Sequence, residues 1–252
     1  MGIDGMLLDI RNYVHAKYAP PGKLWENKIY DSIDIKENDK LLDVGCGNAS
    51  FWERHYAELP AGVELTLLDK RNTVSKDFIE KQNVKFVCDD ICNMTYSSEF
   101  NVILAKDMLY LVDDFDTCVV KISNALSTSG RLYGTCYSVN HMMEIYQALD
   151  KIGIPSVHQN QYLQFNLENI KEKLGKHFSF IGIYPQEDSL IIKNINDALL
   201  FIMSYIADRE QHEGVQQELW IYLKKVFCRQ KAMVINRKMC FFIAKDIIKN
   251  RV

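Results

Sequence analysis

Residues 41–49 constrain this chain more than any other stretch, because they carry the pattern of a strand, a tight turn and a helix start. A short apolar run with one acid, residues 41–44, is followed by Gly45 and Gly47, and a helix-forming segment begins at residue 49. Glycines at such a turn let a ligand approach the backbone, because no Cβ intervenes, and the amides of the helix start point at that ligand. The pattern predicts a nucleotide-type binding loop.

From residue 40 onward, segments with strand patterns alternate with segments with helix patterns. We expect strands at 40–44, 63–68, 84–88, 100–105 and 131–136, with helices at 49–58, 73–81, 113–126 and 141–152. Helical patterns at 3–18 and 23–33 precede them. Strands that alternate with helices of about 10–15 residues predict a parallel sheet with helices on both faces.

The rhythm changes after Pro155. We expect an irregular segment at 156–165, a helix at 167–174, a strand at 178–184 and a short apolar piece at 189–193. Helices at 195–206 and 214–233 and a last strand at 238–244 complete the chain. No repeat or linker divides it, so we expect a single domain over 1–252. Its parts are an N-terminal helical cap (1–37), a core (38–155), a substrate-side elaboration (156–235) and a last strand with tail (236–252).

Composition and charge exclude several classes of protein. The formal net charge is −3, which gives no strong electrostatic footprint for nucleic acid. One basic cluster, which we interpret as a solvated helix face, contains Lys224, Lys225, Arg229, Lys231, Arg237 and Lys238. No apolar run approaches the roughly 20 residues of a membrane span, and acidic residues interrupt the N-terminus, unlike a signal peptide. Seven cysteines without a C-x-x-C pair favour a reducing compartment over disulfides or zinc. We therefore expect a cytoplasmic protein without nucleic acid, membrane or metal partners.

Two classes of ligand use such a glycine loop. Dinucleotide folds use G-x-G-x-x-G, whose third glycine permits close packing of helix on strand, and here Ser50 occupies that place. Asp43 stands two positions ahead of Gly45, where a carboxylate would repel a pyrophosphate and suit a cationic ligand. S-adenosylmethionine carries an ammonium and a sulfonium and no phosphate, so the acid favours it over NAD.

Residues 40–136 resemble the class I S-adenosylmethionine-dependent methyltransferases. Asp43-Val44-Gly45-Cys46-Gly47 is similar to the first motif of that family, and Asp69 ends the second strand where the family places an acid. Residues 86–91 resemble the segment after the third strand, residues 100–105 the fourth motif, and residues 126–132 the turn before the fifth strand.

The resemblance implies a role for each matching residue. Asp69 would bind the ribose hydroxyls, since a carboxylate accepts two hydrogen bonds from a vicinal diol. Asp90, or Asp89 one position earlier, would bind the adenine amino group. The set that we expect at S-adenosylmethionine, or at its product S-adenosylhomocysteine, is Asp43, Gly45, Cys46, Gly47, Asp69, Lys70, Asp89, Asp90, Ile91, Ala105, Lys106 and, from the N-terminal helix, Tyr18.

The resemblance also implies the fold. It is Rossmann-like α/β, a doubly wound and mostly parallel seven-stranded sheet with an antiparallel last strand, an N-terminal helical cap and a C-terminal helical elaboration. Three positions depart from the family pattern. Ala49 replaces the third glycine, and we expect it not to take a left-handed conformation. Asn101 replaces a frequent aspartate, and Thr128 replaces a proline.

Several absences narrow the class of methyl acceptor. The segment after residue 105, Lys106-Asp107-Met108, lacks the N/D-P-P-Y/F pattern of enzymes that act on amino groups of bases or of glutamine. The sequence displays no metal-ligand cluster of the catechol type and no appended RNA-binding module. Segments at 51–52, 65–69, 140–144 and 165–169 resemble a bacterial subset of small-molecule-type enzymes. We expect a small-molecule acceptor from specialised metabolism and a monomer or homodimer.

Methyl transfer from a sulfonium is an in-line displacement in which the enzyme mainly aligns the reacting atoms. A base is needed only when the acceptor carries a proton of high pKa. His141 is the candidate base, because the reference pKa of histidine lies near neutrality, although it equally suits packing at a helix start. The other candidates at the strand ends are Tyr110, Lys106, Asp107, Tyr137 and Asn140. A non-catalytic cofactor-binding partner and an NAD-dependent oxidoreductase remain as alternatives.

Overall fold

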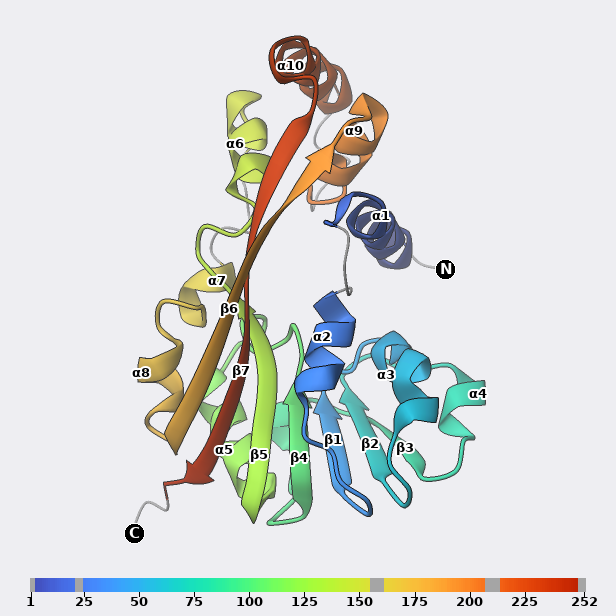
Figure 1. The fold of residues 1–252 in the computed structure, drawn as a ribbon, viewed down its shortest axis with the longest axis vertical. Coiled ribbons are helices and arrows are strands. Elements are labelled where there is room, and N and C mark those ends of the chain that lie inside the picture. The colour runs from blue at the N-terminus through green and yellow to red at the C-terminus, as the bar shows by residue number, and fades with distance from the viewer. Residues whose placement is uncertain (1–2, 21–24, 155–160, 207–213, 249–252) are drawn as a thin grey trace. The chain divides into compact units, whose positions relative to one another are not determined.

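One mixed sheet runs through the computed structural model, which describes residues 3–20, 25–154, 161–206 and 214–248. Within these residues, seven strands lie in the order β3-β2-β1-β4-β5-β7-β6. Six of them are parallel, and β7, the last strand along the chain, is antiparallel (Figure 1). The strands are β1 (Lys40–Val44), β2 (Glu64–Asp69), β3 (Val84–Cys88), β4 (Phe100–Ala105), β5 (Leu126–Tyr137), β6 (Phe178–Ile192) and β7 (Met233–Ile247). The strand order reverses between β1 and β4, and in such sheets the ligand crevice lies at the carboxyl ends there.

The helices of the described residues occur between the strands and at the N-terminus. They are α1 (Ile3–Tyr18), α2 (Trp25–Ser32), α3 (Ser50–His55), α4 (Lys76–Ile79), α5 (Phe115–Ala125), α6 (Met143–Lys151), α7 (Gln161–Gln164), α8 (Ile170–Leu174), α9 (Ile195–Met203) and α10 (Val215–Gln230). Two short 3-10 turns, η1 (Tyr56–Glu58) and η2 (Ile91–Asn93), complete the set. This arrangement confirms the Rossmann-like class expected from the sequence.

The chain forms two units, which we describe separately. The sheet unit contains Trp25–Ser138, Leu163–Pro185 and Cys240–Val252, and the helical unit contains Met1–Leu24, Val139–Tyr162 and Gln186–Met239. The helical unit gathers α1, α6, α9 and α10 around one buried apolar cluster that includes Val14, Ile145, Phe201 and Leu219. We expected a single domain, and this stays a prediction. A measurement of whether the two units unfold together would test it.

Helices cover both faces of the central strands in the sheet unit. Successive residues of a strand point to opposite faces. Leu42 and Ile103 therefore pack into a cluster with α5 and α8, whereas Leu41, Val102 and Leu104 pack into another with α2, α3 and α4. Both faces of β1 and β4 are covered, which explains why most of their residues are apolar.

Several expected elements differ from the structure. The last strand, expected at 238–244, is β7 and begins at Met233, so the helix expected at 214–233 is α10 and ends at Gln230. The helix expected at 73–81 is only α4, because Thr73 bonds its hydroxyl to the Gly47 carbonyl at 2.8 Å and lies outside a helix. The segments at 178–184 and 189–193 are one long strand, β6. The turn expected within 126–132, before the fifth strand, lies inside β5, which begins at Leu126. Residues 161–164, expected to be irregular, form α7, while 155–160 of the same segment lie outside the described residues.

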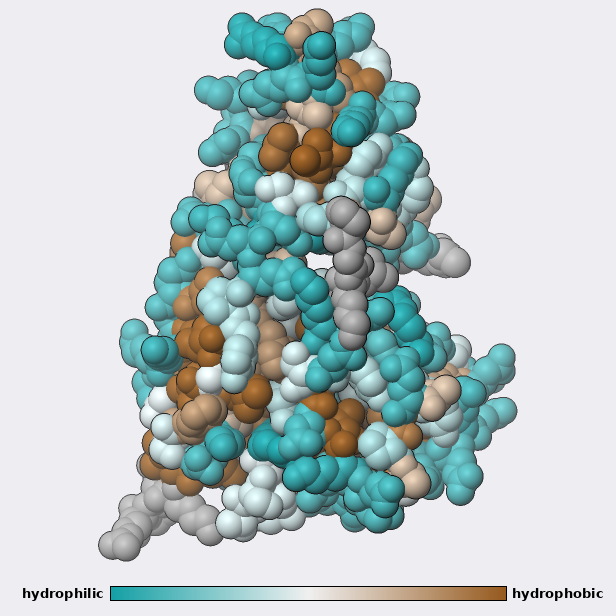
Figure 2. Space-filling model, in the orientation of Figure 1, coloured by the Kyte–Doolittle hydropathy of each residue, from teal (hydrophilic) through white to brown (hydrophobic). Residues whose placement is uncertain are grey.

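Strand β6 ends the strand order and leaves apolar side chains exposed. Phe180 is 43% exposed and Tyr184 is 52% exposed. The visible face is mostly hydrophilic, with brown patches over the part of the sheet that holds β5 and β6 (Figure 2). Residues 186–189 of β6 are four consecutive polar residues, which an edge position permits and a buried strand would not.

Among the described residues, none of the helices has the length and apolar character that crossing a membrane requires. The same residues contain no group of three or more His, Cys, Asp or Glu side chains arranged to hold a metal ion.

Candidate active site

The loop between β1 and α3 takes the conformation that its glycines permit. Gly45 has φ +72° and Gly47 has φ +59°, both left-handed. The Gly45 and Cys46 amides donate to the Leu68 carbonyl at 2.7 and 3.1 Å, which anchors the turn on β2. A Cβ on Gly45 would lie 2.8 Å from the Met108 Cβ, so only glycine fits there. A Cβ on Gly47 would meet no atom within 4 Å, so the backbone faces open space at that point.

Ala49 corrects one expectation from the sequence. It has φ +61° and ψ 14°, the left-handed conformation that we expected alanine to avoid. Its amide donates to the Cys46 carbonyl at 3.0 Å, and its carbonyl accepts from the Glu53 amide at 2.9 Å. Its methyl group is fully buried against the sheet unit's core. These contacts fix a conformation that costs an L-residue roughly 1–2 kcal/mol in isolation.

Asp69 lies directly against the glycine loop, as its position at the end of β2 predicts. Its Oδ2 accepts from the Gly47 amide at 2.8 Å, and its Oδ1 accepts from the Arg71 amide at 2.9 Å. The side chain is 6% exposed. Two backbone donors orient the carboxylate, and an ionised carboxylate has about four lone-pair sites, so it retains capacity for the hydroxyls of a ligand.

Asp43, at the end of β1, is a buried carboxyl with an incomplete set of partners. Its Oδ2 accepts from the Trp52 indole Nε1–H at 2.7 Å, while its Oδ1 is buried without a hydrogen-bond partner. Burial raises the pKa of Asp43 from 3.8 to about 7, although the Trp52 bond and the charge of Lys106 oppose the rise. A nearby ligand cation would stabilise the ionised form.

The two candidate adenine acids follow β3 on the surface. Asp89 Oδ1 accepts from the Asp90 amide at 2.7 Å and from Asn93 Nδ2 at 2.8 Å, and the Asn93 bond chiefly lowers the pKa of Asp89. Asp90 caps η2 by accepting from the Cys92 amide at 2.8 Å. The Asp89 amide donates to the Asp69 carbonyl at 3.1 Å, which joins this segment to the loop region. Ile91 is buried beneath it.

A polar network follows β4. Asp107 Oδ2 accepts from the Lys106 ammonium at 2.8 Å, and the Glu26 carboxylate of α2 lies 3.4 Å from the same ammonium. Asp107 Oδ1 accepts from the Thr135 hydroxyl at 2.6 Å and the Tyr137 hydroxyl at 2.7 Å. Burial alone would raise the pKa of Asp107, but the charge of Lys106 and these bonds bring it below the usual value. Asp107 is therefore an anion at neutral pH.

The other predicted residues of the sheet unit take positions consistent with the strand ends. Tyr110 is half-buried, with its ring edge-on to that of Tyr137 at 5.5 Å. Ala105 is fully buried at the end of β4, and Lys70 is exposed after Asp69. Burial raises the pKa of the Cys46 thiol, which stays protonated.

His141 and Tyr18 belong to the helical unit. The His141 side chain is 3% exposed, and its Nδ1 accepts from the Lys238 amide at 3.0 Å. The Tyr18 hydroxyl donates to Asp197 at 2.5 Å. The base role of His141 and the cofactor contact of Tyr18 therefore stay predictions.

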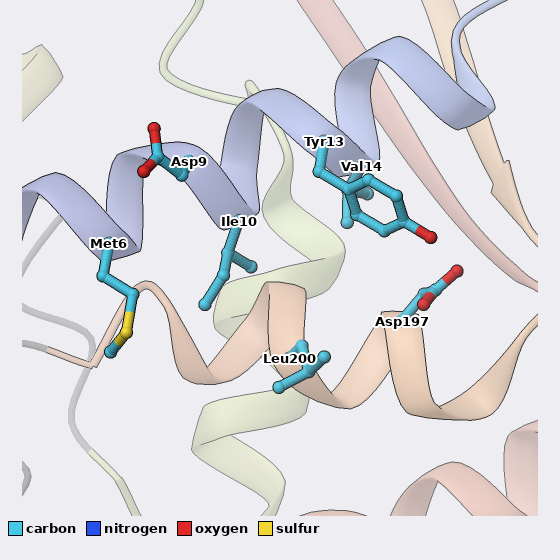
Figure 3. A pocket seen from close by; sticks show the side chains of 7 residues that line it. All are labelled: Met6, Asp9, Ile10, Tyr13, Val14, Asp197 and Leu200. Carbon is cyan, nitrogen blue, oxygen red and sulfur yellow. The ribbon is translucent and has the colours of Figure 1, made fainter.

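The helical unit also contains a shallow groove of about 240 Å³ between α1 and α9 (Figure 3). Its lining consists of Met6, Asp9, Ile10, Tyr13, Val14, Asp197 and Leu200. The aliphatic side chains from the two helices face the same gap, and Tyr13 and Asp197 lie at one end. Burial opposes ionisation of Asp197, but bonds from Lys17 and Tyr18 bring its pKa below the usual value.

Three residues of the site were not identified from the sequence. Trp52 binds Asp43, Glu26 faces Lys106, and Thr135 holds Asp107. Trp52 carried a usable signal, because a buried indole N–H requires an acceptor and Asp43 is the acid of the preceding strand. Glu26 and Thr135 act across long sequence separations and carried no local signal.

The loop fits the cationic cofactor that the sequence suggested. An orphaned carboxylate oxygen on Asp43 suits an ammonium or sulfonium, and the open space beside Gly47 admits a ligand against the backbone. The loop lacks the third glycine of a dinucleotide site, since Ser50 begins α3. A family model described as a methyltransferase domain matches residues 35–173, just over half of the chain. The chain belongs to this family. It is a class I methyltransferase that uses S-adenosylmethionine.

Known proteins resemble this methyltransferase at low sequence identity. Ribosomal RNA small subunit methyltransferase A of Fusobacterium nucleatum subsp. nucleatum is 20% identical over 228 residues, which cover 88% of this chain and 80% of that protein. A putative methyltransferase of Bacillus halodurans superposes with a TM-score of 0.62 at 13% identity, covering 88% of this chain and 98% of that one.

A third similar protein has been solved with ligands. Haemonchus contortus phosphoethanolamine N-methyltransferase 2, in complex with phosphomonomethylethanolamine and S-adenosylhomocysteine, superposes with a TM-score of 0.59 at 18% identity. The match covers 96% of this chain and 57% of that protein, so the chain spans little more than half of its length. At these sequence identities, the structural similarity shows that the fold is shared and shows nothing about the substrate.

Proposed function

We propose that this methyltransferase transfers the methyl group of S-adenosylmethionine to a small-molecule acceptor, which binds at the carboxyl ends of β4 and β5. A cluster of partly exposed polar side chains carries the proposal. Lys106, Asp107, Tyr110 and Tyr137 are each partly buried, while the residues beside them along the two strand ends are mostly buried. A small set of polar groups among buried neighbours suits a compact ligand with a few polar groups.

The chain's contribution to the reaction would be alignment. S-adenosylmethionine supplies, when bound, a methyl group on a sulfonium that leaves as a neutral sulfide. The side chains after β4 and β5 would hold the acceptor so that its nucleophilic atom lies in line with that methyl group, which removes much of the entropic barrier. Met108 packs on Gly45, so the acceptor side of the site adjoins the cofactor loop.

Charge supports a small acceptor over a polyanion. Arg237, one member of the basic cluster in the sequence, is 6% exposed and holds both oxygens of Asp188 at 2.5 and 2.7 Å. Its guanidinium is therefore committed to a buried ion pair. With a net charge of −3, the chain has little to neutralise phosphates.

One comparison favours a second candidate, methylation of an RNA base. The Fusobacterium nucleatum relative is named as a ribosomal RNA methyltransferase and matches 88% of this chain. The Haemonchus contortus protein, whose bound phosphomonomethylethanolamine is a small molecule, favours the first candidate. Both identities are too low to decide between them.

Transfer of a labelled methyl group separates the candidates. The protein is incubated with methyl-tritiated S-adenosylmethionine and a whole-cell extract, which is then divided into metabolites below about 3 kDa, RNA and protein. The proposal predicts label in the metabolite fraction. Label in RNA would establish the second candidate, and binding of the cofactor without any transfer would identify a non-catalytic partner.

A further inference from the structure

Asp107 holds a backbone conformation that is costly for a residue other than glycine. Its φ is +57°, in the left-handed region. The Asp107 amide donates to Thr135 Oγ1 at 2.8 Å, and that hydroxyl donates back to Asp107 Oδ1. Residues held in such conformations cost of order 1–3 kcal/mol and gather at ligand sites. The strain here places a carboxylate at the end of β4 with an orientation fixed by β5.

The side chains around Asp107 donate their hydrogen bonds to its carboxylate. The hydroxyls of Thr135 and Tyr137 and the ammonium of Lys106 each donate to its carboxylate. A hydroxyl whose proton is committed in this way offers only acceptor lone pairs to any further partner. The oxygens of Asp107 and Tyr137 therefore suit a ligand group that donates hydrogen bonds.

The aromatic rings point to the same kind of ligand. The rings of Tyr110 and Tyr137 lie edge-on at 5.5 Å beside the carboxylate, and an ammonium is attracted to the faces of such rings. The ammonium of Lys106 faces both Asp107 and Glu26, and Glu26 also pairs with Arg54. The two cations therefore balance the two carboxylates, and the preference for a donor ligand rests on the acceptor oxygens and the aromatic rings.

We propose that Asp107 and Tyr137 form an acceptor subsite selective for an amine, with the Asp107 carboxylate contacting the amine and Tyr137 accepting from it. This inference rests on the proposed small-molecule function. Thr135 acts as a positioning residue that keeps Asp107 in its conformation. A carboxylate that stays ionised at neutral pH binds and orients the amine. Transfer to the nitrogen itself requires the neutral amine, so its proton passes to solvent before the methyl group is transferred, and Asp107 does not take it.

Binding of three matched probes tests the subsite in protein saturated with S-adenosylhomocysteine. Tyramine, 4-ethylphenol and 4-hydroxyphenylacetate share a phenol ring and differ in bearing a cationic, a neutral or an anionic tail. We expect tyramine to bind at least 10-fold more tightly than the other two by calorimetry. Equal affinities, tighter binding of the acid, or no binding of tyramine would overturn the proposal.

Asp107→Asn is the decisive variant, because asparagine tolerates the left-handed conformation and removes the charge, while its amide NH2 replaces one of the two acceptor oxygens. We expect a 10- to 100-fold loss of tyramine affinity and no change for 4-ethylphenol, with a lower unfolding midpoint because one donor of the network loses its acceptor. Asp114→Asn is the matched control, since Asp114 caps α5 through the Thr117 amide and asparagine caps equally well. It should keep the preference for tyramine.

Tyr137→Phe should lose part of the preference, and Thr135→Val should lose it together with a lower unfolding midpoint. A preference that survives in Asp107→Asn would refute the subsite even if the protein methylates small molecules. Label in RNA in the transfer experiment would instead refute the proposed function, so the two failures are distinguishable.

Discussion

Asp43 is buried, but in the folded protein without a ligand its carboxyl group lacks a full set of hydrogen-bond partners. Its carboxyl must be buried beside the glycine loop, yet one of its oxygens has no partner there. The indole of Trp52 provides the single hydrogen bond that makes the buried carboxyl tolerable. A site that leaves a polar atom unsatisfied before binding gains more from a cation than a fully satisfied site would.

Trp52→Phe removes the hydrogen bond to Asp43 while keeping an aromatic ring in the core. We expect a loss of about 1–3 kcal/mol of unfolding free energy, because both carboxyl oxygens are then buried without a donor. The same change should raise the pKa of Asp43 further. Urea unfolding measures the first effect. Tyr56→Phe, which deletes only the exposed bond to the Gln82 carbonyl, is the control and should change little.

The pKa of Asp43 predicts how cofactor affinity depends on pH. Its folded value of about 7 exceeds the ordinary 3.8, so the protonated carboxyl stabilises the fold fully below about pH 4 and that contribution is lost as pH rises through 7. A bound cation favours the ionised form. Affinity for S-adenosylmethionine should therefore rise about tenfold from pH 6 to pH 8, with proton release on binding at pH 6.

Calorimetry in buffers of different ionisation enthalpy measures both the affinity and the released proton. The Asp43→Asn variant should bind more weakly and without this pH dependence. An affinity that is flat between pH 6 and pH 8 in the unaltered protein would contradict the role given to Asp43.

At the scale of elements, α9 depends on a cap that the sequence displays. The Asn194 side chain accepts from the Asn196 amide at 2.8 Å and from the Asp197 amide at 3.3 Å. We expect Asn194→Ala to cost about 1 kcal/mol of unfolding free energy, since two amides of the first turn lose their acceptor. Asn196→Ala, an exposed change within the same helix, should be neutral or slightly stabilising. Thermal unfolding of the two variants makes the comparison.

Elements whose patterns are set locally were predictable. Strands β1, β3 and β4 have the predicted bounds. The apolar runs of β1 and β4 match strands that are buried on both faces, whereas β3 lies at the edge of the sheet and is only partly buried. Elements set by distant contacts were not. The hydroxyl of Thr73 binds the Gly47 carbonyl and shortens α4, and the edge position of β6 lets polar residues continue a strand. The residues next to Thr73 and within β6 do not indicate either the shortened helix or the continued strand.

The same distinction applies to the candidate site. Asp43, Gly45, Gly47 and Asp69 were predictable because their order and spacing form a known pattern, and Asp69 does contact the Gly47 amide. The left-handed Ala49 was predicted wrongly, since its backbone bonds and buried methyl group override the preference of an isolated alanine.

At the scale of the whole molecule, two strands pass through both units. Strand β6 changes unit after Pro185 and β7 after Met239. We expect one cooperative unfolding transition, because the loss of either unit would leave part of each strand unpaired. Trp52 reports on the sheet unit and Trp220 on the helical unit, so fluorescence of single-tryptophan variants should give coincident urea midpoints. Midpoints that differ between the two probes would indicate two domains.

Titration calorimetry of S-adenosylmethionine into the unaltered protein and Asp69→Ala tests the cofactor loop most directly. Asp77→Ala, an exposed change in α4, serves as the charge-matched control. We predict binding to the unaltered protein and the control, a loss of at least tenfold in affinity for Asp69→Ala at an unchanged fold, and no binding of NAD. Equal affinity in all three proteins, or binding of NAD alone, would contradict the assignment of Gly45, Gly47 and Asp69 to the cofactor.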